Sequence, residues 1–104
     1  MHRIVYSSQL TRKMSPGEIE RLVEESRRNN LRDDVTGYLL HNNTQFFQVL
    51  EGPEDVLVQR YSRIAVDPRH GHLRLVRSEP IKARAFANCP MGVLTSEHLP
   101  AWSC

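Results

Sequence analysis

The sequence predicts an α+β fold of the ferredoxin-like order β-α-β-β-α-β, extended by a fifth strand, in one domain of 104 residues. Three observations predict it. A short β-rich run precedes a capped amphipathic helix, an Asn-Asn pair separates two apolar strands, and a second helical pattern precedes an alternating segment. This order places two helices on one face of a mostly antiparallel sheet.

The first strand and the first helix have clear local signals. Residues 3–8 (RIVYSS) form a β-rich run. Ser15 can act as N-cap, Pro16 suits the first helical position, and Glu18 completes a capping box. The stripe that follows at helical spacing consists of Ile19, Leu22, Val23 and Ser26. The polar segment 29–34 is expected to close this helix.

The middle of the chain predicts a hairpin and a second helix. Two strands are expected within residues 35–52, joined by a turn at Asn42 and Asn43. The second helix is expected to start at Pro53 and to run to about Val66. Its apolar residues are Leu57, Val58, Tyr61, Ile64 and Ala65.

The last third of the chain predicts a turn and two further strands. Residues 67–72 (DPRHGH) are expected to form the turn, and residues 73–80 alternate as a fourth strand. Residues 84–94 are expected to form the fifth, where Pro90 favours an edge or a bulge. The tail, residues 95–104, is expected to be irregular.

One strand carries a polar interruption. In the segment FFQVLEG, Gln48 shares a face with Phe46 and Leu50, while Phe47 and Val49 point to the other face. A carboxamide between two core residues needs hydrogen-bond partners, because burying it without them costs free energy. Gln48 is therefore a candidate functional residue.

Composition excludes several classes of protein. A net charge of +2 is too small to indicate nucleic-acid binding, and no apolar run reaches the length of a membrane helix. The start of the chain lacks a signal-peptide pattern, and Cys89 and Cys104 then suggest a reduced, cytoplasmic protein. The scattered histidines form no metal-ligand pattern, and the glycines form no phosphate loop.

Several further polar residues occupy otherwise apolar or helix-end positions. They are Tyr6, Ser26, Asn29, Asn30, Arg63, Asp67, Arg69 and His70. Each could be satisfied locally, with Tyr6 on a carbonyl, the asparagines as caps and Asp67 paired with Arg69. If they converge on one cleft, such amide, hydroxyl and guanidinium groups suit a flat heterocycle.

The sequence resembles the BLUF family of flavin-binding blue-light sensors. The resemblance rests on an ordered set of motifs, VYSSQ, SRRNN, VTGYLL, FFQVLEG, RIAVDPRH and FANCPMG, which together span residues 3–94. It implies a BLUF photosensor domain over residues 1–94, with a short tail at 95–104. The implied cofactor is FAD, bound noncovalently between the two helices.

The resemblance also implies roles for individual residues. Tyr6 would donate an electron and a proton to the excited flavin, and Gln48 would bridge the Tyr6 hydroxyl and the flavin. Asn30 would bind the carbonyl and N3–H side of the ring. The residues implied nearby are Asn29 and Ser26, and those implied to anchor the pyrimidine end are Arg63, Asp67, Arg69 and His70. Rearrangement of the Gln48 hydrogen bonds would then produce the signal.

This chain departs from the family pattern at two positions. Cys89 stands where the family often has tryptophan, so Met91 becomes the better candidate for sensing Gln48. Asp34 stands where the family favours glycine, and aspartate tolerates turns.

The expected function is blue-light reception without enzymatic activity, signalling to a partner. That partner would be a second copy of the chain or a separate effector protein, docked on the outer sheet face through Val5, Phe47 and Val49. The alternative is a ligand-binding or oligomerisation module of the same fold without photochemistry. A small hydrolase is a third hypothesis, for which the chain offers neither a nucleophile motif nor a phosphate loop.

Overall fold

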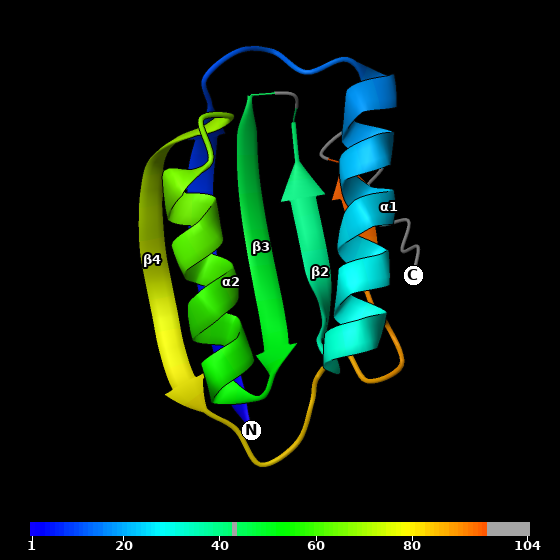
Figure 1. Ribbon diagram of the computed structural model, residues 1–104, viewed down its shortest axis with the longest axis vertical. Helices are drawn as coiled ribbons and strands as arrows, with labels where there is room; N and C mark the ends of the chain where they lie inside the picture. The colour runs from blue at the N-terminus through cyan, green and yellow to red at the C-terminus, as the bar shows by residue number, and fades with distance from the viewer. Residues whose placement is uncertain (43, 96–104) are drawn as a thin grey trace.

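The computed structural model describes residues 1–42 and 44–95, which form five strands and two helices. In chain order these are β1 (His2–Leu10), α1 (Pro16–Asp33), β2 (Thr36–His41), β3 (Gln45–Gly52), α2 (Glu54–Val66), β4 (His70–Pro80) and β5 (Gly92–Thr95). Both helices lie on the same face of the sheet (Figure 1). The predicted fold class is confirmed.

The sheet has the strand order β4-β1-β3-β2-β5. The pairs β1–β3, β1–β4 and β2–β3 are antiparallel, whereas β5 pairs with β2 in parallel. The first strand therefore lies inside the sheet, between two strands that come much later in the chain. Its register with β3 sets Tyr6 directly opposite Gln48.

Helix α1 begins as predicted and ends within the polar segment 29–34 that was expected to close it. Ser15 and Glu18 form both hydrogen bonds of the capping box, each 3.2 Å long. The helix then continues through the polar segment to Asp33. Asp34 terminates it in the left-handed region with φ of 59°. Because glycine enters this region most easily, aspartate here fits a position where the family favours glycine.

Two predicted boundaries near the end of the chain are wrong. The turn after α2 is shorter than expected, since His70 and Gly71 already pair with β1. The fifth strand is also shorter, because residues 84–91 form a loop and only Gly92–Thr95 is strand. Pro90 has no N–H to donate to a neighbouring strand. The carbonyl of Cys89 accepts a hydrogen bond from the Gly37 N–H, but this bond lies outside the ladder between β2 and β5.

The core lies between the sheet and the helices. Its buried residues are Ile4, Tyr6, Met14, Ile19, Val23, Val35, Leu39, Phe46, Leu50, Leu57 and Met91. At Gly37 a Cβ atom would lie 2.0 Å from the carbonyl oxygen of Val49, so the contact between β2 and β3 requires glycine.

Some predictions fall outside the described residues. They concern Asn43 in the hairpin turn, Cys104, and the tail from residue 96 onward; Thr95 ends β5. Within residues 1–42 and 44–95, no helix combines the length and apolar character needed to cross a membrane.

Candidate functional site

A cleft of about 200 Å³ lies between α1 and α2, above the inner face of the sheet. Its apolar walls are Leu22, Val23, Leu39, Phe46, Leu50 and Ile64. Nine residues predicted for the site also line it, namely Tyr6, Ser26, Asn29, Gln48, Arg63, Asp67, Arg69, His70 and Met91. Residues from both helices, from β1, β2 and β3, and from the start of β4 thus meet Met91 at one place.

Gln48 uses both ends of its carboxamide. Its Oε1 accepts a hydrogen bond from the Tyr6 hydroxyl, and its Nε2 donates to the sulfur of Met91 over 3.4 Å. Phe46 and Leu50, its neighbours on the same face of β3, are buried as the alternation predicts. The polar interruption of the strand is therefore satisfied by an aromatic hydroxyl and a thioether.

Tyr6 lies in the core with 1% of its surface exposed. Burial raises the pKa of its phenol, although the nearby Arg60 guanidinium lowers it in part. The ring of Tyr61 packs edge-on against the Tyr6 ring, with centroids 5.8 Å apart. Tyr6 therefore keeps its proton well above neutral pH and donates it in the hydrogen bond to Gln48.

Asn30 is the one predicted binding residue that does not line the cleft. It is fully buried, and its Nδ2 donates to the carbonyl of Pro90 over 2.6 Å. Its Oδ1 accepts a hydrogen bond from Arg60, which also pairs with Asp33 at 2.8 Å. Asn30 thus connects α1 to α2 and to the loop before β5. Its contact with a flavin ring remains a prediction.

The mouth of the cleft contains a locally paired group. Arg69 and Asp67 form an ion pair of 2.6 Å, which holds the pKa of the Asp67 carboxyl below its usual range. The ring of His70 lies 2.9 Å, Nδ1 to Oγ, from the Ser8 hydroxyl, and burial lowers its pKa. The expected local pairing of Asp67 with Arg69 is confirmed, whereas Tyr6 bonds a side chain rather than a carbonyl.

Sequence reasoning missed Arg60 and Glu25, which also line the cleft. A signal for Arg60 existed, because it lies three and four residues before Arg63 and Ile64, on the same face of α2. Glu25 precedes Ser26 directly and gave no comparable signal.

The lining residues fit a flat, polar-edged ring system such as a flavin. In the described part of the chain, the side chains of Ser26, Asn29 and Arg63 line the cleft without a hydrogen-bond or ion-pair partner. Unpaired donors and acceptors beside apolar walls are what a planar heterocycle requires. The volume is below the roughly 300–1,000 Å³ of sites that enclose a whole ligand, so the cleft matches the ring system of a ligand and does not enclose an entire flavin nucleotide.

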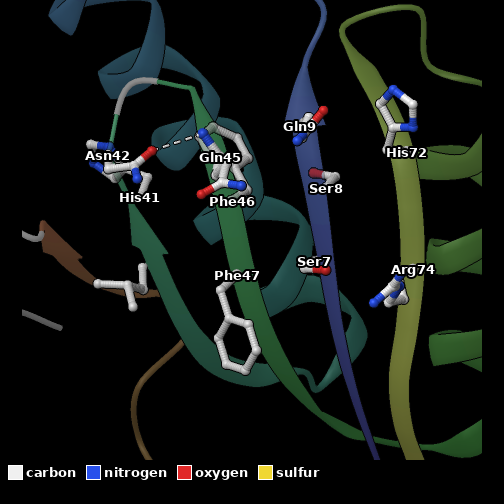
Figure 2. A pocket seen from close by; sticks show the side chains of 11 residues that line it. Ser7, Ser8, Gln9, His41, Asn42, Gln45, Phe46, Phe47, His72 and Arg74 are labelled. Carbon is white, nitrogen blue, oxygen red and sulfur yellow. Dashed lines mark hydrogen bonds between the residues drawn. The ribbon is translucent and has the colours of Figure 1, made fainter.

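A larger hollow, of about 540 Å³, lies on the opposite face of the sheet. Figure 2 shows this face of the sheet with the helices behind the strands. Phe47, Ser7 and Arg74 are among the residues that line the hollow. Phe47 is 40% exposed there. The hydrogen-bonded pair of Tyr6 and Gln48 lines the inner cleft and not this hollow, so the inner cleft is the candidate ligand site.

Comparison with known proteins shows the family of this chain. The family model BLUF, described as sensors of blue-light using FAD, matches residues 1–92. Subunit beta of the photoactivated adenylate cyclase of Euglena gracilis is 40% identical over 83 residues, covering 80% of this chain and 10% of that protein. The chain therefore spans about a tenth of the length of that relative.

Solved structures show the same fold. The dark-state structure of BlrB, a BLUF protein, has a TM-score of 0.86 and 33% identity over 92% of this chain and 73% of its own. Klebsiella pneumoniae BlrP1, in a structure with FMN and cyclic diGMP, has a TM-score of 0.83 and 35% identity over 90% of this chain and 25% of its own.

The fold and the cleft define a small α+β domain with a cleft of ring-system size between its two helices. The chain belongs to the BLUF family of flavin-binding blue-light sensors. Family membership makes this region a sensor module rather than a catalytic domain, which agrees with the function predicted from the sequence.

Proposed function

We propose that the flavin of this domain is FAD and that Tyr6, Gln48 and Met91 form its photochemical switch. The family description names FAD, which supports this choice. The neighbour BlrP1 was solved with FMN, and a cleft of ring size does not discriminate between the two flavins. The flavin therefore has to be identified after it is extracted from the purified protein, because the shape of the cleft does not distinguish FAD from FMN.

A bound flavin would supply light absorption and acceptance of one electron in its excited state. Tyr6 would donate that electron, and its phenolic proton would pass along the hydrogen bond to Gln48 Oε1 and on through the carboxamide to the flavin. The carboxamide of Gln48 has a donor end and an acceptor end, so rotation or tautomerisation changes which partners it can bond. Tyr6 recovers its electron and proton when the reaction reverses, and Gln48 is left rearranged.

The rearranged Gln48 changes its contact with Met91. In the structure the amide end of Gln48 points at the sulfur. An exchange of the two ends would present an oxygen to that sulfur, which removes the hydrogen bond. Met91 has flexible torsions and can repack when this contact is lost. The connection from Tyr6 through Gln48 to Met91 is the observation that carries the proposal.

A light-minus-dark absorption spectrum of the purified protein tests the proposal. The protein should be yellow, release FAD on denaturation, and show a reversible red shift after blue light. A colourless protein that cannot be reconstituted with FAD would overturn it. Protein that releases FMN instead would correct the cofactor and leave the switch intact.

We propose further that the sensor domain covers residues 1–94, acts in the cytoplasm, and signals through the outer face of the sheet. The exposed ring of Phe47, beside Val5 and Val49, supports an interaction surface there. The proposed occupant is a second copy of the chain or a separate effector protein. Because the cyclase of Euglena extends far beyond the matched region, its activity is not transferred to this chain.

A further inference from the structure

Glu51, near the end of β3, is a carboxylate with no exposed surface. Arg3 on β1 binds its Oε2 twice, through Nε at 2.9 Å and Nη2 at 2.6 Å. A buried charge is costly unless its remaining lone pairs are also satisfied. Its other partners therefore show what else this carboxylate does.

Those partners come from the loop between β4 and β5. The N–H of Ala85 donates to Oε2 over 3.0 Å, and the N–H of Phe86 donates to Oε1 over 2.9 Å. The backbone carbonyl of Glu51 accepts from Arg84 Nη1 over 3.1 Å. Burial alone would raise the pKa of Glu51, but the hydrogen bonds from these amides and from Arg3 bring it below its usual range. The Glu51 carboxylate, as an anion, therefore holds the backbone of Ala85 and Phe86, while its backbone carbonyl holds the side chain of Arg84.

The far end of the same loop is held by α1 and β2. We call residues 84–91 the anchored loop. Arg27 Nε donates to the carbonyl of Met91 over 3.1 Å, and Asn30 donates to the carbonyl of Pro90. The N–H of Gly37 donates to the carbonyl of Cys89 over 3.0 Å. With both ends fixed, the backbone of this loop sets where the Met91 side chain lies against Gln48.

We propose that Glu51 is a positioning residue of the light switch, which fixes the anchored loop so that Met91 meets Gln48. The inference rests on the proposed roles of Gln48 and Met91. Glu51 does not line the cleft and, three residues beyond Gln48 on β3, faces the opposite side of the sheet. Its influence on Gln48 therefore passes through the loop and not through a side-chain contact.

The test compares Glu51→Gln with Glu79→Gln. In Glu51→Gln the new amide N–H₂ faces donors, so a loop N–H or Arg3 loses its acceptor. Glu79 is the other carboxylate partner of Arg3, at 3.3 Å, and no described loop residue bonds to it. The control variant thus disturbs the charge pairing of Arg3 and leaves the loop untouched.

Hydrogen–deuterium exchange in the dark is the first readout. The backbone amides of residues 85–89 and 91 should exchange about tenfold faster in Glu51→Gln than in the unmodified protein, as expected for a lost hydrogen bond to a charged group. Exchange in Glu79→Gln should be unchanged. Equal exchange of the loop in Glu51→Gln and in the unmodified protein would overturn the proposal, as would the same acceleration in Glu79→Gln.

The second readout is optical. Glu51→Gln should bind flavin and keep the red shift, because the bond between Tyr6 and Gln48 is intact, but the dark recovery rate should change several-fold. An unchanged recovery rate alongside a loosened loop would overturn the positioning role. If the unmodified protein shows no red shift, the proposed function fails, while the exchange experiment still tests the anchor. Should Glu51→Gln not fold, Arg84→Ala removes the side-chain contacts of the loop to Thr36, Glu51 and Asp34 but keeps the Ala85 and Phe86 amides on Glu51, and it should give the same changes to a smaller degree.

Discussion

The amide nitrogen of Gln48 lies 3.4 Å from the sulfur of Met91, while the oxygen of the same carboxamide accepts the Tyr6 hydroxyl. The two contacts are made by opposite ends of one planar group. They must therefore be broken together when the carboxamide turns. This coupling connects an aromatic donor on β1 to the residue directly before β5.

Gln48→Leu should bind flavin and lose the normal red shift. Leucine has a similar size, so the cleft keeps its shape, but it can neither accept from Tyr6 nor donate to Met91. The unpaired Tyr6 hydroxyl should lower the free energy of unfolding by about 1–3 kcal/mol. Light-minus-dark spectra and a urea titration measure both effects. A normal red shift in this variant would show that Gln48 is not the switch.

Tyr6→Phe should also bind flavin without the normal photocycle, because it removes the phenolic proton and the hydrogen bond to Gln48. Tyr61→Phe is the matched control, since it keeps the edge-on ring contact with Tyr6 and removes a different hydroxyl. Transient absorption after a blue flash distinguishes the two variants. Equal photocycles in Tyr6→Phe and in the unmodified protein would contradict the assigned donor.

Met91→Ala should keep the red shift and weaken the light-dependent structural change in β5. Met91 is 1% exposed, so truncation should also cost about 2–5 kcal/mol of stability. Met91→Leu conserves the volume without the sulfur and serves as the control for packing. Difference infrared spectra in the amide region give the measurement. An undiminished amide signal in Met91→Ala would exclude Met91 as the output residue.

His41 should make the protein less stable in mild acid. It is 8% exposed, its Nδ1 has no hydrogen-bond partner in the described part of the chain, and burial lowers its pKa. Since the unfolded chain protonates histidine near pH 6.5, the stability contribution is present above about pH 6.5 and is lost as the pH falls through the folded pKa. The melting temperatures at pH 7.5 and pH 5.5 should differ less in His41→Leu than in the unmodified protein. Some decline should remain in His41→Leu, because burial also lowers the pKa of His70. Equal declines in the two proteins would refute the role of His41.

Phe47→Asp should reduce self-association if the outer sheet face joins two copies of the chain. The exposed Phe47 ring lies at the hollow on that face (Figure 2), and a charge there would be costly to bury. Sedimentation velocity over a range of concentrations compares it with Val58→Asp, which changes an exposed residue on α2. A monomer at high concentration, unchanged by Phe47→Asp, would exclude this interface between copies.

Local patterns predicted most of the elements and eight of the residues that line the cleft, and the family resemblance added Met91. The capping box at Ser15 and Glu18 and the alternation around Gln48 are short-range features, so the sequence reveals them directly. The loop before β5 was missed because its backbone hydrogen bonds go to Glu51 and Gly37, which are distant in sequence. Arg60 was missed because a single arginine on a helix gives no sign of which partner it reaches.

The sequence by itself determined the order of elements, the face on which Gln48 lies, and the family, because each depends on neighbouring residues or on ordered motifs. The family resemblance implied that Tyr6 and Met91 act with Gln48, but only the tertiary structure decided that they contact opposite ends of its carboxamide and that Asn30 bonds Pro90. These contacts join residues more than 40 positions apart, so they exist only once the register of β1 with β3 and the path of the loop are fixed. Burial then makes these hydrogen bonds necessary, because a polar group removed from water must bond to a partner that the fold supplies.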